Sequence, residues 1–280
     1  MRRMGYFLVL SIVILSLLAS GCEFFEGLKT KHNAENWFKL GVKYYERGDL
    51  ENAKECFYNA LEIDINYADA YRELGNVYEY EENYNLAILN YNRAIRFNPN
   101  DAQAYHARGL AYYFLDEYKK SLDDFVKAIE LEPNNAIFYY NRGLVYKQLM
   151  EKEKAMEDSD KSISLNPNIY EAYYLRGILY SELGDFYKAI KDLDKSISIY
   201  DQYGDAYSAR GIAHLKLGEY NEALKDLEKA IAIDPNYPPF YSQRGLIYVK
   251  LEKLNEAKSD FEKFCEMGYD WACEKLNELK

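Results

Sequence analysis

The cysteines and histidines are the residues whose side chains could most readily carry chemistry, and they are few. The 280-residue sequence contains only these of the two types: Cys22, Cys56, Cys265, Cys273, His32, His106 and His214. Four cysteines are too few for a disulfide scaffold. The histidines are scattered, and neither a metal-ligand cluster, a phosphate-binding loop nor a nucleophile elbow occurs. We therefore expect a protein that is not an enzyme and that needs no cofactor and no metal ion.

The charge of the chain excludes another class of partner. The formal net charge is −11, and no basic cluster interrupts the acidic sequence. Such a surface repels phosphate backbones, so we expect no binding to nucleic acid. Acidic pairs such as Asp123 and Asp124 recur on expected helix surfaces, where they are interpreted as solvent-facing residues.

The amino terminus has the pattern of an export signal. Arg2 and Arg3 precede an apolar run over residues 6–18, and the small residues 19–21 close it. The run is shorter than the ~20 residues that a helix needs to span a bilayer, and a basic start with a small-residue end is typical of a cleaved signal. The alternative is an uncleaved anchor helix.

The cysteine behind this run makes the interpretation more specific. Residues 18–22 read "LASGC", which resembles the lipobox of bacterial lipoproteins, although Ala19 stands where that family usually has Leu, Val or Ile. The resemblance implies a signal peptide over residues 1–21, lipidation with fatty acyl chains such as palmitate at Cys22, and a short tether over residues 22–33. It also implies a membrane contact through the lipid anchor, and a place in the bacterial cell envelope at the outer membrane rather than the inner one.

From Ala34 onward the sequence repeats every 34 residues. The repeats begin at residues 34, 68, 102, 136, 170, 204 and 238, and glycine stands at position 8 of each: Gly41, Gly75, Gly109, Gly143, Gly177, Gly211 and Gly245. The first repeat, with Trp37, Leu40, Gly41, Tyr44, Ala53, Phe57 and Ala60, resembles the tetratricopeptide pattern. The resemblance implies an all-α fold, namely a right-handed superhelical solenoid of seven helix pairs over residues 34–271.

Two positions of the repeat change together along the chain. Position 7 is leucine in repeats 1 and 2 and arginine afterwards, while position 23 is Cys56, then Asn90, and aspartate afterwards. An arginine on a packing face needs a partner. The pattern therefore predicts five ion pairs between the two helices of a repeat or between adjoining repeats. The alternative is that both residue types were copied from one ancestral repeat and do not meet.

The carboxyl end contains two cysteines separated by seven residues. This spacing of Cys265 and Cys273 resembles the disulfide-bridged helix pairs of Sel1-like relatives of the repeat. The resemblance implies a disulfide between them, which an exported protein can keep. Two reduced thiols in the core are the alternative. Residues 272–280 are expected to form a capping helix.

In tetratricopeptide proteins the first helices line a concave groove. Carried over position by position, the resemblance implies these groove residues: Phe38, Tyr45, Arg72, His106, Leu110, Tyr113, Tyr140, Leu144, Tyr174, Ile178, Ile212 and Leu246. An apolar, aromatic groove suits a peptide segment or another protein, so we expect a membrane-anchored scaffold for protein–protein interaction. Two alternatives remain: position 9 packs against the next repeat, or the groove tyrosines bind carbohydrate or peptidoglycan.

Overall fold

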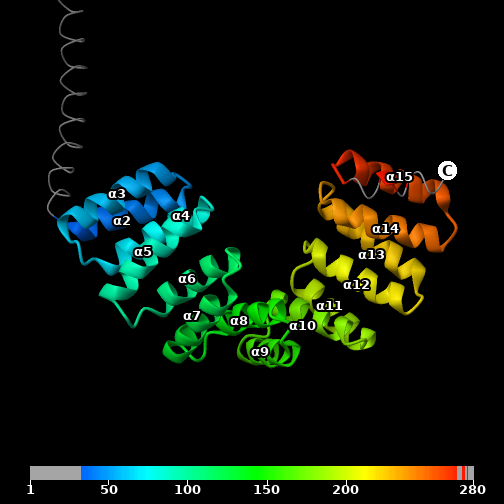
Figure 1. Ribbon diagram of the computed structural model, residues 1–280, viewed down its shortest axis with the longest axis horizontal. Coiled ribbons are helices and arrows are strands. Elements are labelled where there is room, and N and C mark those ends of the chain that lie inside the picture. Colours follow the sequence, from blue (N-terminus) through cyan, green and yellow to red (C-terminus); the bar gives the residue numbers. More distant parts are fainter. Residues whose placement is uncertain (1–32, 270–272, 275, 277–280) are drawn as a thin grey trace, which may run out of the picture. The chain divides into compact units, whose positions relative to one another are not determined.

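A computed structural model describes residues 33–269, 273, 274 and 276 of the chain (Figure 1). These residues form fourteen helices and no strand. The predicted all-α fold is therefore confirmed. The predicted signal peptide (1–21), Cys22, the tether apart from Asn33, and the capping helix (272–280) apart from residues 273, 274 and 276 lie outside the described residues.

The helices follow one another in consecutive packed pairs, one pair per repeat. The first helices of the pairs are α2 (Ala34–Glu46), α4 (Ala68–Tyr80), α6 (Ala102–Phe114), α8 (Ala136–Gln148), α10 (Tyr170–Glu182), α12 (Gly204–Lys216) and α14 (Pro238–Lys250). The second helices are α3 (Leu50–Ile63), α5 (Tyr84–Phe97), α7 (Tyr118–Leu131), α9 (Lys152–Leu165), α11 (Phe186–Ile199), α13 (Tyr220–Ile233) and α15 (Leu254–Glu266). Every first helix begins at the residue where a sequence repeat begins.

The chain divides into two compact units, here called the N-terminal unit, which ends at Glu132, and the C-terminal unit, which begins at Pro133. The N-terminal unit contains α2 to α7, and the C-terminal unit contains α8 to α15. Within each unit the first helices of successive repeats also contact each other. Stacking of this kind buries the apolar face of each helix pair against its neighbour.

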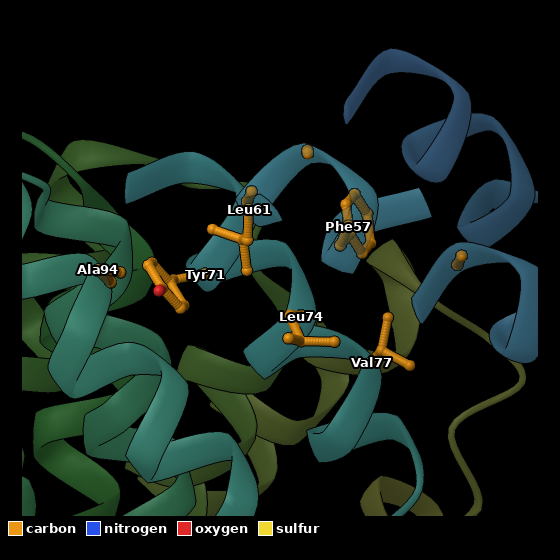
Figure 2. Close-up of a cluster of buried hydrophobic side chains, with 10 residues drawn as sticks. Phe57, Leu61, Tyr71, Leu74, Val77 and Ala94 are labelled. Carbon is orange, nitrogen blue, oxygen red and sulfur yellow. The ribbon is translucent and has the colours of Figure 1, made fainter. Parts of the chain in front are cut away.

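In repeats 1, 2, 3 and 7 the glycine at position 8 is required because an aromatic ring lies against it. A Cβ atom added to Gly41 would lie 2.6 Å from Cε1 of Phe57, and one added to Gly75 would lie 2.4 Å from Cε1 of Tyr91. Both rings are fully buried. Figure 2 shows the neighbouring cluster of Phe57, Leu61, Tyr71, Leu74, Val77 and Ala94, which joins the first repeats into one core. The ring at position 24 thus fills the space that the glycine leaves.

Repeat 4 departs from this arrangement. Its position 24 is Ser159, a fully buried residue whose Oγ donates to the carbonyl of Ala155 at 2.8 Å. Without a ring there, a Cβ atom on Gly143 would be no closer than 3.3 Å to its neighbours. A side chain at Gly143 would therefore meet less steric hindrance than one at Gly41 or Gly75.

The turn within each pair requires left-handed backbone at position 15 of the repeat. Glycine fills it in three repeats, at Gly48, Gly184 and Gly218, with φ between 75° and 82°. Non-glycine residues adopt φ between 57° and 61° in the other four: Glu82, Asp116, Met150 and Glu252. A side chain makes this conformation costly, by about 1 kcal/mol or more. The same turn is therefore less favourable in free energy in the four repeats without glycine than in the three with it.

The five predicted ion pairs are all present, and each joins the two helices of one repeat. In every pair arginine Nε and Nη2 donate to the two carboxylate oxygens at 2.6–2.9 Å; the pairs are Arg108–Asp124, Arg142–Asp158, Arg176–Asp192, Arg210–Asp226 and Arg244–Asp260. The aspartates are buried, so the interpretation of Asp124 as a solvent-facing residue is wrong, whereas Asp123 is exposed. In three repeats arginine Nη1 also donates to the preceding repeat, at Asn92, Asp160 or Asp194. These planar forks fix the angle between neighbouring helices.

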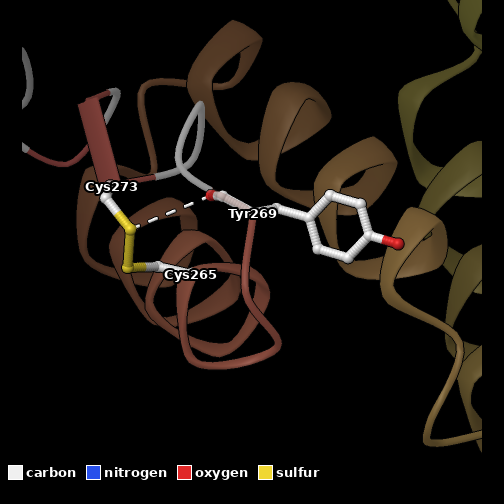
Figure 3. Close-up of a disulfide and its surroundings, with 3 residues drawn as sticks. All are labelled: Cys265, Tyr269 and Cys273. Carbon is white, nitrogen blue, oxygen red and sulfur yellow. Dashed lines mark hydrogen bonds between the residues drawn. A yellow bond between two sulfur atoms is a disulfide. The ribbon is translucent and has the colours of Figure 1, made fainter.

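The structure joins Cys265, at the end of α15, to Cys273 by a disulfide, with the two Cα atoms 5.2 Å apart (Figure 3). The Sγ atom of Cys273 lies 3.8 Å from the carbonyl oxygen of Tyr269. The bond therefore links the end of α15 to Cys273. Cys56, by contrast, is a buried free thiol, and its burial raises the pKa of the thiol to about 11.

Candidate binding site

The C-terminal unit contains a hollow of about 310 Å³ on the face formed by α10, α12 and α14. We call it the C-terminal pocket. Its lining consists of apolar, hydroxyl, amide and carboxylate groups: Tyr174, Ile178, Ser181, Glu182, Asp205, Ser208, Ala209, Ile212, Tyr237, Pro239 and Gln243. A volume of this size with a few polar groups is typical of a site for one or two side chains of a ligand.

Helix periodicity places the apolar part of this pocket. Tyr174 and Ile178 are four residues apart on α10, so their side chains lie on one face, and Ile212 faces them from α12. The ring of Tyr174 meets that of Tyr203 edge-on, with centroids 4.9 Å apart. This contact holds the Tyr174 ring at the wall of the pocket, and burial raises the pKa of its hydroxyl. The hydroxyl therefore stays neutral.

Polar contacts fix the remaining walls. The Ser208 hydroxyl donates to Oε1 of Gln243 at 2.6 Å and so links α12 to α14. Burial raises the pKa of Asp205, and the nearby carboxylate of Asp234 raises it further. Glu182 forms an ion pair with Lys152 at 2.8 Å. The pocket thus combines an apolar floor with carboxylates at its edge, which suits an apolar or basic anchor of a bound segment.

The N-terminal unit has a hollow of more polar character, with a volume of about 430 Å³. It lies between α4 and α6, and its lining is Arg72, Glu73, Asn76, Glu79, Gln103, His106, Ala107 and Leu110. The guanidinium of Arg72 donates to Asp101 at 2.6 Å and to Asp69 at 2.9 Å. Burial lowers the pKa of His106 to about 4, so its imidazole is neutral at physiological pH. Arg72 is therefore already engaged by carboxylates of its own surroundings, Glu73 of this lining among them.

A second hollow of the N-terminal unit, of about 350 Å³, lies at the carboxyl ends of α2, α4 and α6. We call it the aromatic pocket. Its lining is Tyr45, Asn76, Glu79, Tyr80, Glu82, Tyr84 and Phe114. Four aromatic rings and two carboxylates therefore surround it, and no lysine or arginine belongs to its lining.

The structure brings seven of the twelve predicted groove residues to these hollows. Tyr174, Ile178 and Ile212 line the C-terminal pocket, Tyr45 lines the aromatic pocket, and Arg72, His106 and Leu110 line the polar hollow. Whether they contact a partner stays a prediction.

The other five predicted residues lie elsewhere on the first helices. The Phe38 ring packs on Phe57 and Tyr67, and Tyr140 and Leu144 pack against the next repeat. Tyr113 contacts the rings of Phe114 and Tyr118, and Leu246 is 43% exposed on α14. The alternative in which position 9 packs against the neighbouring repeat therefore holds for Leu144.

Several lining residues come from positions that were not predicted to face the groove. Tyr80 and Phe114 occupy position 13, and Tyr237 occupies position 34, just before α14. A sequence signal exists for the last of these, because tyrosine recurs at position 34 in Tyr67, Tyr203 and Tyr237. Position 13 gives no comparable signal, since its role depends on how the next repeat covers the helix end.

Two further features bear on what this surface can do. Among the described residues, no group of three or more His, Cys, Asp and Glu side chains is placed to hold a metal ion. Of the helices that the structure describes, none combines the length and the apolar content of a bilayer-spanning segment.

Comparison with known families agrees with the geometry. The family model described as "TPR repeat" matches residues 41–79, 80–116, 112–149 and 214–252, and two "Tetratricopeptide repeat" models match residues 160–191, 136–169 and 238–267. The chain belongs to the tetratricopeptide repeat family. Proteins of this family are in general scaffolds for protein–protein interaction and not enzymes. No curated protein matches the chain.

Solved tetratricopeptide structures share the fold. A tetratricopeptide repeat protein from Parabacteroides merdae has a TM-score of 0.70 and 23% identity, over 88% of this chain and 98% of that one. PilF of Pseudomonas aeruginosa has a TM-score of 0.67 and 22% identity, over 79% and 96%. YrrB, described as a TPR protein with an unusual peptide-binding site, has a TM-score of 0.54 and 24% identity, over 71% and 99%.

Proposed function

We propose that this tetratricopeptide protein is a membrane-tethered scaffold of the bacterial cell envelope that holds a segment of a partner protein on its first helices. The C-terminal pocket is the observation that carries the proposal. Its apolar floor, Tyr174, Ile178 and Ile212, can bury an anchor side chain, and Ser208 and Gln243 offer groups for the backbone or a polar neighbour. YrrB, a neighbour in fold, is described as having a peptide-binding site, which favours the same class of ligand here.

The Arg–Asp pairs support a binding role because they hold the pocket walls in place before a ligand arrives. Arg176 on α10 bonds to α11 of its own repeat and to α9 of the preceding repeat. Arg210 on α12 bonds in the same way to α13 and to α11. A preorganised site loses less conformational entropy on binding than a loose one. The pocket can therefore bind a segment with a smaller loss of its own conformational entropy.

Photo-crosslinking in cells tests the binding site. A chain with p-benzoylphenylalanine in place of Tyr174 is expected to form a defined adduct with a protein, because this residue lines the pocket. The matched control carries the same photoreactive residue in place of Tyr187, which is 73% exposed on the second helix α11. Equal adducts from both positions, or protein-free adducts with glycan at residue 174, would overturn the proposal.

The tether rests on the "LASGC" sequence ending at Cys22. Two or more acyl chains hold a protein stably on a bilayer, whereas one holds it only marginally. With eleven residues between Cys22 and α2, the first helix of the scaffold would begin within about 36 Å of the membrane surface.

Replacement of Cys22 by serine is expected to release the chain from the membrane fraction and to abolish its labelling with radioactive palmitate. Cys56→Ser is the matched control, because Cys56 is a buried thiol within α3. Membrane fractionation and lipid labelling of both variants make the comparison. An unchanged membrane fraction and full label on Cys22→Ser would contradict the tether.

A further inference from the structure

The aromatic pocket contains a carboxylate that lacks a positive partner. Burial raises the pKa of Glu79, and its Oε2 accepts from the hydroxyl of Tyr91 at 2.6 Å. In the described part of the chain no lysine or arginine forms an ion pair with Glu79. A partly buried carboxylate without a counterion is unfavourable, and a cation brought beside it would relieve that cost.

A buried tyrosine holds this carboxylate in place. Tyr91 is fully buried between the helices of repeat 2, and its hydroxyl lies 2.6 Å from Glu79 and 2.9 Å from Oδ1 of Asn76. Position 24 is a phenylalanine, leucine or serine in every other repeat. Repeat 2 therefore alone carries a hydroxyl that reaches from the core to the pocket and orients an acidic group there.

The rings of the pocket are arranged to accept a positive group as well. Tyr84 and Phe114 stack with centroids 5.1 Å apart, while Tyr80 is 70% and Phe114 54% exposed. The face of an aromatic ring attracts cations. Elsewhere in the described residues, arginines and lysines lie over tyrosine rings, as Arg108 does over Tyr105, but none lies over the rings that line this pocket.

We propose that the aromatic pocket binds a lysine or arginine side chain of the partner protein. The inference rests on the proposed scaffold function and adds the chemistry of one anchor. A volume of about 350 Å³ admits such a side chain. Aromatic walls contact its methylene stem, and Glu79 and Glu82 meet its charge. The net charge of −11 also favours the approach of a basic segment.

Binding of small probes to the full-length chain in detergent tests this anchor. The probes are Nα-acetyl-lysine amide, Nα-acetyl-arginine amide, Nα-acetyl-glutamine amide and choline. Each is titrated by saturation-transfer NMR. The two basic amides are expected to bind, and the glutamine amide is not. Choline stands for a free small quaternary ammonium ion. If choline binds tenfold more tightly than both basic amides, the site serves a small molecule and the proposal is wrong.

Two variants locate the binding. Glu79→Gln keeps an oxygen for the Tyr91 hydroxyl but removes the charge, and Phe114→Ala removes a ring; each is expected to weaken the basic probes roughly tenfold. Glu62→Gln, an exposed change on α3, is the matched control and is expected to bind normally. Equal binding by Glu79→Gln and the parent chain would overturn the inference. The Tyr174 crosslink would still test the scaffold function separately.

Discussion

Replacement of Gly75 by alanine is expected to lower the free energy of unfolding by about 3 kcal/mol. The new methyl group would lie 2.4 Å from the ring of Tyr91, which is fully buried and cannot move aside without disturbing the core. Moving this ring would also break its hydrogen bonds to Glu79 and Asn76. Urea unfolding followed by circular dichroism measures the loss.

Gly143→Ala is the matched control for this prediction. Repeat 4 has Ser159 in place of the ring, and the nearest neighbours of an added Cβ atom are 3.3 Å away. Alanine is a better helix former than glycine by about 1 kcal/mol, which offsets a small steric cost. The control is therefore expected to unfold within about 1 kcal/mol of the parent chain. A loss as large as that of Gly75→Ala would refute the account of position 8.

Removal of one member of an Arg–Asp pair is expected to lower the free energy of unfolding by a similar amount to Gly75→Ala. Arg142→Leu leaves the buried Asp158 without the guanidinium that donates to both of its oxygens, and such a loss costs about 3 kcal/mol. The double variant Arg142→Leu with Asp158→Asn copies repeat 2, which pairs Leu74 with Asn90. It is expected to recover at least half of the lost stability in urea unfolding.

The pH dependence of Arg142→Leu provides a second readout. Burial already raises the pKa of Asp158 above its ordinary value of 3.8, and Arg142 opposes that rise. Without the arginine the pKa of the folded state rises further, so the folded chain binds the proton more tightly than the unfolded chain does. The deficit in unfolding free energy should therefore shrink as pH falls through the folded pKa towards 3.8. A deficit independent of pH would count against an unpaired carboxylate as its cause.

Much of the fold could be predicted because the repeat is a local pattern. The 34-residue spacing and the glycine at position 8 carry the resemblance to tetratricopeptide repeats, which implied the helix pairs, and the joint change of positions 7 and 23 predicted the five ion pairs. Each of these features depends only on contacts between a helix and its immediate neighbours. The division after Glu132 carried no such signal, because it reflects contacts summed over several repeats.

The pockets were less predictable for a related reason. Tyr174, Ile178 and Ile212 could be carried over from the groove positions of tetratricopeptide proteins, but Tyr80 and Phe114 line the aromatic pocket only because helix ends of three repeats meet there. The role of Glu79 depends on Tyr91, whose hydroxyl is an exception in the repeat pattern. The most distinctive chemistry of this pocket therefore depends on one departure from the repeat pattern, and the structure was needed to relate Tyr91 to Glu79.

Hydrogen–deuterium exchange with the protein captured through residue 174 tests the central claim most directly. The full-length chain would be measured alone and with that partner. If the first helices hold the partner, amides of α10, α12 and α14 that flank the C-terminal pocket will exchange more slowly in the complex. Protection confined to the second helices α11 and α13, with α10, α12 and α14 unchanged, would contradict it.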